Sequence, residues 1–184
     1  MDALENIILR NSARALSLPI PSEEQMKKVY QAALRAPDHA WLRPSRFIQV
    51  TGNGLNKLST IFEKYAKEEL KETDQHKIEK YKNAPFRAPM IIILISTITD
   101  HPKVPEIEQV MSTAAAQNIL LALNALKFGG MWRTGALALN AKISNHLGLD
   151  ENQKVLGYLY VGTTEGSEKR IPELNPDDFI TKWE

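Results

Sequence analysis

Two arginines and a hydroxyl fall within five residues near the start of the chain. Arg10 and Arg14 carry permanent positive charges on forked donors, and Ser12 lies between them. This set of donors suits a phosphate group, because guanidinium groups form short, charge-assisted hydrogen bonds to phosphate oxygens. Taken alone, the pattern fits equally a polar helix end whose arginines face water, and composition favours that simpler interpretation. The surrounding elements must therefore decide between the two.

Other kinds of reactive site find little support in the residue types. The chain has no cysteine, which excludes thiol chemistry, thiolate metal ligands and disulfides. Its four histidines show no metal-ligand spacing and no facial triad with acidic neighbours, so no metal site is predicted. No serine lies in a G-x-S-x-G turn, so a hydrolytic nucleophile is not expected either. The strongest motifs are binding motifs, and no catalytic side chain is predicted.

Composition limits the class of protein. The chain has 184 residues, 23 Lys plus Arg and 22 Asp plus Glu, and is 43% hydrophobic. One globular domain spanning residues 1–184 is expected. Near-neutral charge argues against a nucleic-acid binder that would use Arg10, Arg14, Arg43 and Arg46. An acidic amino terminus and the absence of a long apolar run predict a cytoplasmic protein with no membrane partner.

The first half of the chain reads as helices around one strand. Apolar spacing predicts a helix over residues 3–9, which delivers Arg10 just past its end. A capping box at Ser22 and Gln25 begins a second helix that Pro37 forbids from continuing. Residues 46–51 alternate like a strand and stop at a Gly-Asn-Gly turn, and a third helix follows over residues 55–66. Residues 67–82 are expected to form an exposed helical excursion in which only Leu70, Ile78 and Tyr81 touch the core.

The second half supplies the centre of the sheet. Residues 90–95 are uninterruptedly apolar and rich in isoleucine, which suits a strand covered on both faces. Residues 106–128 predict one long helix, buried in the domain or at a subunit interface, that Gly129-Gly130 ends. A short strand, a helix over residues 140–147 and a strand over residues 154–161 follow, and the tail is irregular. With no G-x-G-x-x-G, the sequence predicts an α+β fold with a central sheet flanked by helices.

Several segments together resemble the nitroreductase family across nearly the whole chain. The first, R10-N-S-A-R14, is similar to the family's R-R-S-x-R opening. Short length and a G-x-W-R-T-G-A-L stretch resemble most closely the YdjA-like branch of small bacterial NAD(P)H nitroreductases. The matching segments are residues 10–14 (RNSAR), 36–37 (AP), 44 and 47 (P and F), 83–89 (NAPFRAP), 128–137 (FGGMWRTGAL) and 157–162 (GYLYVG).

This resemblance implies a mainly antiparallel sheet and a homodimer with a long interface helix. It implies non-covalent FMN bound between the subunits, with NADH or NADPH as co-substrate and a small-molecule electron acceptor. In a first group, Arg10 and Ser12 would contact the phosphate and ribityl chain, and Arg14 would lie near the phosphate or the pyrimidine edge. A second group would reach a flavin held mainly by the other subunit, and a third would run beside the isoalloxazine ring. The implied cofactor-binding residues are Arg10, Asn11, Ser12 and Arg14 in the first group, Arg35 and His39 in the second, and Met131, Trp132 and Arg133 in the third.

The chain departs from the family pattern at three places. Asn11 replaces the second arginine of the opening, which removes one positive charge. Leu42-Arg43-Pro44-Ser45 stands where the family usually shows a Q-P-W-type segment, so the flavin entrance is expected to be more basic and less aromatic. The tail offers Arg170 as the weak counterpart of a carboxy-terminal residue that binds phosphate in larger members.

The resulting hypothesis is an FMN-dependent NAD(P)H oxidoreductase of nitroreductase type. In that scheme hydride passes from NAD(P)H to the flavin, and electrons then pass to a nitroaromatic, quinone or related acceptor in ping-pong order. The alternative is a flavin-binding carrier or sensor with little turnover.

Overall fold

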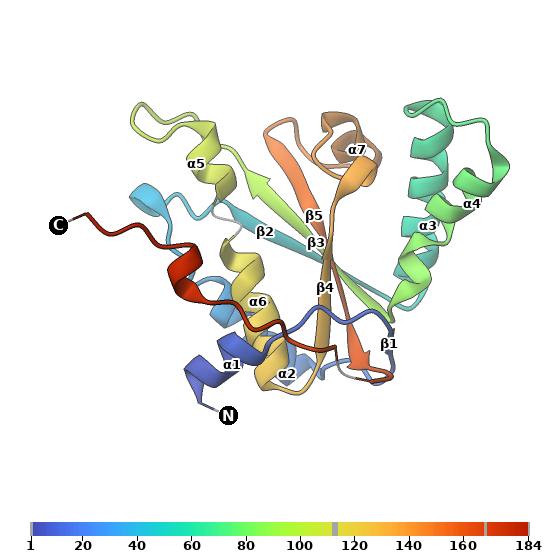
Figure 1. Cartoon of the computed structure of the whole chain (residues 1–184). Coiled ribbons are helices and arrows are strands. Elements are labelled where there is room, and N and C mark those ends of the chain that lie inside the picture. The colour runs from blue at the N-terminus through green and yellow to red at the C-terminus, as the bar shows by residue number, and fades with distance from the viewer. Residues whose placement is uncertain (1, 112–113, 168, 184) are drawn as a thin grey trace.

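A twisted antiparallel sheet with helices on both faces forms the body of the protein. The computed structural model describes residues 2–111, 114–167 and 169–183. The strands are β1 (Leu16–Ser17), β2 (Ser45–Thr51), β3 (Met90–Thr97), β4 (Gly129–Arg133) and β5 (Gln153–Thr164). The helices are α1 (Ala3–Leu9), α2 (Glu23–Ala33), α3 (Asn53–Glu68), α4 (Gln75–Lys82), α5 (Glu106–Met111), α6 (Ala114–Ala125) and α7 (Ala141–His146). These elements confirm the predicted α+β class (Figure 1).

The long strand β5 organises the sheet. The strand order is β1-β5-β3-β2, and β4 also pairs with β5. Every pairing between these strands is antiparallel. Strand β3 pairs with β5 between residues 153 and 161, β4 pairs with residues 158–162, and β1 pairs with Thr163 and Thr164 at the end of β5. The predicted mainly antiparallel sheet is therefore confirmed.

Strand β3 is covered on both faces, as its uninterrupted apolar sequence predicts. Successive side chains of a strand point to opposite faces. Ile91, Ile93 and Ile95 join the core beneath α3 and α7, whereas Met90 and Ile92 join the core beneath α2 and α6. Figure 1 shows these two helical layers on either side of the sheet.

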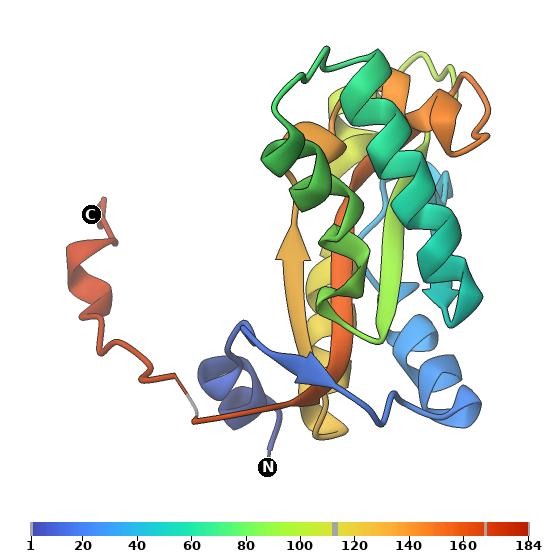
Figure 2. The same cartoon turned by 90° about the vertical axis from the view of Figure 1, so that its right-hand side faces the viewer.

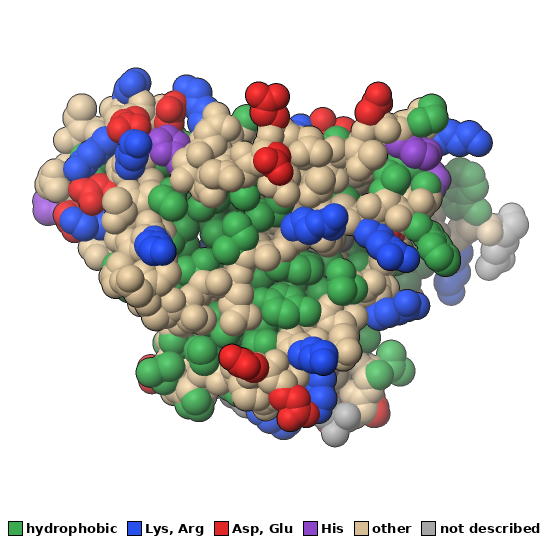
Figure 3. Space-filling model, turned by 180° about the vertical axis from the view of Figure 1, so that it is seen from behind, with side chains coloured by type: hydrophobic (Ala, Val, Ile, Leu, Met, Phe, Trp, Pro, Cys, Tyr) green, Lys and Arg blue, Asp and Glu red, His purple; other side chains and the backbone are tan. Residues whose placement is uncertain are grey.

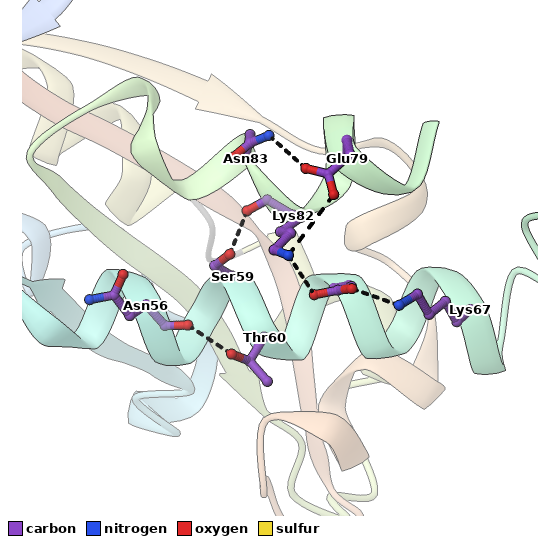
Figure 4. A network of polar contacts seen from close by, with 8 residues as sticks. Asn56, Ser59, Thr60, Lys67, Glu79, Lys82 and Asn83 are labelled. Atoms are coloured by element: carbon purple, nitrogen blue, oxygen red, sulfur yellow. Dashed lines mark hydrogen bonds and ion pairs between the residues drawn. The ribbon is translucent and has the colours of Figure 1, made fainter. Parts of the chain in front are cut away.

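The charged segment after α3 folds back along it as α4. Ser59, which is buried in α3, donates a hydrogen bond to the Lys82 carbonyl at 2.7 Å. Glu63 lies between Lys67 (2.6 Å) and Lys82 (3.4 Å), so a chain of polar contacts joins the two helices (Figure 4). The side chains expected to touch the core do so: Ile78 is buried, and Leu70 and Tyr81 pack against the core.

Two features differ from the sequence-based expectation. Strand β1 was not predicted, because two residues carry no detectable alternation. Gly129-Gly130 was expected to end a helix but instead begins β4. A side chain has no room there: a Cβ on Gly129 would lie 2.4 Å from Thr164 Oγ1, and one on Gly130 would lie 2.5 Å from a Leu120 methyl. These glycines are needed for close packing against β5 and α6.

The predicted helix over residues 106–128 corresponds to α5 and α6. Residues 112–113 between them lie outside the described residues. Helix α6 ends at Ala125, and its buried side packs within the chain against α2 and the sheet. Asn118 donates to the Ala32 carbonyl at 3.0 Å and fixes that contact. Its role as an interface helix stays a prediction.

The carboxy-terminal tail leaves the body. Residues 169–183 run past α1 and out to one side (Figure 2). Seen from behind, hydrophobic side chains gather in the middle of the surface, with a few Lys and Arg side chains among them and most other charged side chains around them (Figure 3). Within the described part of the chain, no helix is both long and apolar enough to cross a membrane.

Candidate active site

The arginine loop begins where α1 ends. The Arg10 N–H caps the helix by donating to the Asn6 carbonyl at 3.2 Å. Its side chain is half-buried, and Nη1 is buried with no hydrogen-bond partner in the described part of the chain. A buried charged donor without a partner costs stability, so this guanidinium is suited to an anion supplied from outside the protein.

The loop is joined to the start of β4. Ser12 forms a parallel bridge with Gly130, and the Ala13 N–H donates to the Gly130 carbonyl at 3.2 Å. The Ser12 N–H donates to Asn11 Oδ1 at 3.1 Å, which fixes the turn between the two residues. The first and third predicted groups of site residues therefore lie on adjoining segments.

The tail closes over the same loop. Asn11 Nδ2 donates to the Lys169 carbonyl at 3.1 Å, and Lys169 Nζ donates to the Ser12 carbonyl. Sequence reasoning missed Lys169 and offered only its neighbour Arg170. The available signal was the Lys169-Arg170 pair in a tail of otherwise mixed composition.

A cavity of about 940 Å³ opens between the loop, the turn after α6 and the start of the tail. Its size is within the range of sites that hold small ligands. It is rich in positive charge, with Glu165 as the opposing carboxylate. Its polar lining includes Asn11, Ser12, Arg14, Lys127, Lys169 and Arg170.

Strand β4 carries the predicted ring-contacting residues. Trp132 lies against Gly157 of β5, close enough that a Cβ on Gly157 would be 2.2 Å from the indole Nε1. The Arg133 guanidinium lies 5.3 Å from the centre of the Tyr160 ring, and its Nε is buried without a hydrogen-bond partner in the described residues. Met131 is half-buried and packs against the core. These residues do not line the cavity but extend along the strand from it.

The tyrosines behind β4 are neutral. Burial raises the pKa of the Tyr160 phenol, although the nearby Arg87 and Arg133 lower it in part. Burial also raises the pKa of Tyr158, whose hydroxyl donates to the Leu137 carbonyl at 2.5 Å. They support the strand as packed rings rather than as acids or bases.

Arg35 and His39 lie apart from the other predicted residues. Both are exposed beyond the end of α2 and do not line the cavity. His39 Nδ1 lies 2.6 Å from Glu108 Oε2 of α5. Within one chain the structure therefore brings together Asn11, Ser12 and Arg14 at the cavity, and places Arg35 and His39 elsewhere.

Among the described residues, no three His, Asp or Glu side chains gather as metal ligands. What the arrangement offers is a cation-rich cavity beside an edge strand, which suits a phosphorylated ligand with a planar portion along β4.

Comparison with known proteins adds sequence evidence. The Nitroreductase family model matches residues 7–163. The chain is 38% identical over 183 residues to the Escherichia coli K12 protein named "Putative NAD(P)H nitroreductase YdjA", covering 98% of this chain and 99% of that one. It is 34% identical over 184 residues to a similarly named Haemophilus influenzae protein, with the same coverage of both chains.

Solved structures share the fold. A nitroreductase-like family protein from Bacillus cereus superimposes with a TM-score of 0.83 at 20% identity, covering 100% of this chain and 97% of that one. A Bacteroides fragilis nitroreductase with bound FMN gives a TM-score of 0.76 at 22% identity, covering all of both chains.

Proposed function

Because the chain belongs to the nitroreductase family, we propose that it is an FMN-dependent NAD(P)H oxidoreductase of nitroreductase type. The names of its relatives in Escherichia coli and Haemophilus influenzae support the activity. The bound FMN of the Bacteroides fragilis nitroreductase supports the cofactor. The observation that carries the proposal is the charge of the cavity lining, where Arg14, Lys127, Lys169 and Arg170 face the single carboxylate of Glu165 among the described lining residues. Arg10 does not line the cavity itself, but it precedes the lining residue Asn11, and its Nη1 is buried with no hydrogen-bond partner among the described residues.

The cations would hold the phosphate. Ser12 and Arg14 would bind it from the opening loop, and Lys169 and Arg170 would add charge from the tail. The side-chain ammonium of Lys169 already donates to the backbone carbonyl of Ser12, so the tail and the loop would act as one phosphate-binding unit. Arg10 would supply a further donor at the end of α1.

Strand β4 would position the ring system. In the part of the chain that the structure describes, no strand pairs with the other edge of β4 beyond the Ser12 bridge, so the backbone there could meet a ligand. Arg133, whose buried Nε has no hydrogen-bond partner among the described residues, would place positive charge beside the flavin and favour its reduced, anionic form. When bound, FMN supplies the redox chemistry, taking a hydride from NADH or NADPH and returning electrons to a nitroaromatic, quinone or related acceptor in ping-pong order.

We propose that the active form is a homodimer with both subunits contributing to each flavin site. Helix α1 has no buried residue, and Leu4, Ile7 and Ile8 are exposed on it. Exposed apolar surface of this extent marks an interaction site. The tail adds further exposed apolar side chains: Ile171, Leu174, Phe179, Ile180 and Trp183. Arg35 and His39 lie away from the cavity of their own chain, as residues that serve a partner's flavin would.

An absorbance spectrum of the purified protein tests the cofactor. We expect the maxima of oxidised flavin, about one FMN per subunit as the chemistry requires, and bleaching by NADH or NADPH without oxygen. A yellow protein that neither nucleotide reduces would indicate a carrier or sensor instead. A colourless protein that FMN cannot reconstitute would overturn the proposal.

Light scattering tests the assembly. The native chain is expected to run as a dimer, and Ile7→Asp should shift it toward monomer with loss of FMN. Lys57→Asp, an exposed change on α3, serves as the control. A native monomer that binds FMN stoichiometrically would contradict the shared site.

A further inference from the structure

The loop between α2 and β2 presents an aromatic ring and a cation to solvent. Trp41 is 79% exposed, and the Arg43 guanidinium lies 5.9 Å from the centre of its ring. A tryptophan this exposed leaves a large apolar surface in water, where it contributes little to the stability of the single chain. The pair therefore calls for a role other than packing.

The backbone of this loop is held in an unfavourable conformation. Ala40, Trp41 and Arg43 all have positive φ, at 55°, 56° and 50°. Non-glycine residues in this region cost about 1 kcal/mol or more each, and such strain persists at ligand-binding segments where neighbours hold it. Here the Arg43 N–H donates to Asp38 Oδ2 at 2.7 Å, and Arg46 Nη1 donates to the Arg43 carbonyl at 2.6 Å.

The charges of the loop single out Arg43. Asp38 accepts the Arg43 N–H, and Glu108 is engaged with His39 at 2.6 Å. The Arg46 guanidinium is occupied by two carbonyls, those of Arg43 and Ser45. Among the described residues, no carboxylate pairs with the Arg43 guanidinium. The Arg43 guanidinium therefore has neither an ion pair nor a hydrogen bond within the described part of the chain, and it lies beside an exposed indole face.

We propose that Trp41 and Arg43 select the electron acceptor, favouring aromatic acceptors that carry a carboxylate. An acceptor ring would stack on the indole while its carboxylate pairs with the guanidinium, since Arg forks match carboxylates and indoles stack on planar rings. This inference rests on the proposed function, in which His39 of the same loop approaches the flavin held by the partner subunit.

Matched acceptors test the proposal. With NAD(P)H saturating, kcat/KM is measured for 4-nitrobenzoate and for 4-nitrobenzamide, which have similar shapes and differ in charge. Arg43→Gln is expected to lower the ratio of kcat/KM for 4-nitrobenzoate to kcat/KM for 4-nitrobenzamide by about threefold, which corresponds to the free energy of an exposed ion pair. Trp41→Ala should lower kcat/KM for both acceptors by about fivefold, and Trp41→Phe should restore most of it. Lys80→Gln removes the same charge from exposed α4 and should leave the ratio as in the native protein.

The outcomes separate this inference from the function beneath it. A protein that holds FMN and is reduced by NAD(P)H, yet keeps its ratio in Arg43→Gln, overturns the inference and leaves the proposed function intact. Loss of the dimer in Trp41→Ala would show that a second copy covers the indole, which also overturns it. A native protein without flavin or turnover overturns both.

Discussion

Replacing Gly157 by alanine tests whether the absence of a side chain at Gly157 allows the Trp132 indole to pack against β5. Gly157 has φ +145° and lies in β5 where the register against β3 shifts, between Leu94 and Ile95. An added Cβ would lie 2.2 Å from Trp132 Nε1 and 3.0 Å from the Arg133 carbonyl oxygen. A Cβ contact of 2.2 Å essentially never occurs, and one of 3.0 Å is unusually tight, so the indole, the β4 backbone or both must move.

The expected cost has two parts. A side chain at this positive φ costs about 1 to 3 kcal/mol, because L residues rarely adopt it. Displacing the indole removes part of its packing against β5 and adds about 1 kcal/mol. We therefore expect Gly157→Ala to lower the free energy of unfolding by about 2 to 4 kcal/mol.

Urea denaturation measures that free energy, with Gly148→Ala as the matched control. Gly148 also has positive φ, at +70°, but a Cβ there would have no atom within 4 Å. Both changes reduce the entropy of the unfolded chain equally, so that contribution cancels between them. Gly148→Ala should cost about 1 to 2 kcal/mol from the backbone alone.

Tryptophan emission reports on the indole itself. The other two tryptophans are far more exposed, 79% for Trp41 and 95% for Trp183, against 36% for Trp132. In a background of Trp41→Phe and Trp183→Phe, Gly157→Ala should shift the emission to longer wavelength. Emission that stays unchanged, with a stability loss no greater than that of Gly148→Ala, would refute the claim that Gly157 seats Trp132.

Three further changes probe other contacts. Ser59→Ala removes a buried 2.7 Å hydrogen bond to the Lys82 carbonyl and should lower the free energy of unfolding by about 1 to 2 kcal/mol in urea denaturation. The control Thr60→Ala removes an exposed hydrogen bond to the Asn56 carbonyl and should cost less than about half of that. Equal losses would contradict the link between α3 and α4. A hydrogen bond from Lys142 holds the pKa of Glu69 below its usual 4.5, so the stabilisation by this pair is present above pH 4.5 and is lost as pH falls through the lower pKa of the folded state. Between pH 7 and pH 3, the free energy of unfolding should therefore decline less steeply for Glu69→Gln than for the native protein, and identical slopes would count against the pair. Arg10→Ala should weaken FMN binding by about 1.5 to 3 kcal/mol in calorimetric titration, because a charge-assisted hydrogen bond to the phosphate is lost. The control Lys57→Ala, which changes an exposed lysine on α3, should leave the affinity for FMN unchanged. An unchanged affinity in Arg10→Ala would remove Arg10 from the site.

Much of the fold follows from local sequence patterns. The capping box of Ser22 and Gln25 begins α2 with both reciprocal hydrogen bonds in place. The apolar run that starts at Met90 becomes the doubly covered strand β3. Side-chain periodicity and helix caps act within a few residues, so sequence alone contains the information that sets these elements.

The residues of the opening loop in the candidate site could also be predicted from the sequence. Arg10 and the residues up to Arg14 formed a recognisable motif, and the structure places Asn11, Ser12 and Arg14 at one cavity. The tail residue that contacts this loop could not be predicted. Lys169 reaches Ser12 across 157 residues of chain, and nothing near either residue in the sequence records that contact.

Tertiary structure alone decided three further points. Leu16 and Ser17 pair with the end of β5. Gly129 and Gly130, which the sequence predicts as a helix end, instead begin β4 at two positions with no room for a side chain. The tertiary structure also placed His39 next to Glu108, apart from the cavity. The physical reason is common to all three: hydrogen-bond pairing and close packing join segments far apart in the chain, so each residue's place depends on partners that its own sequence neighbourhood does not specify.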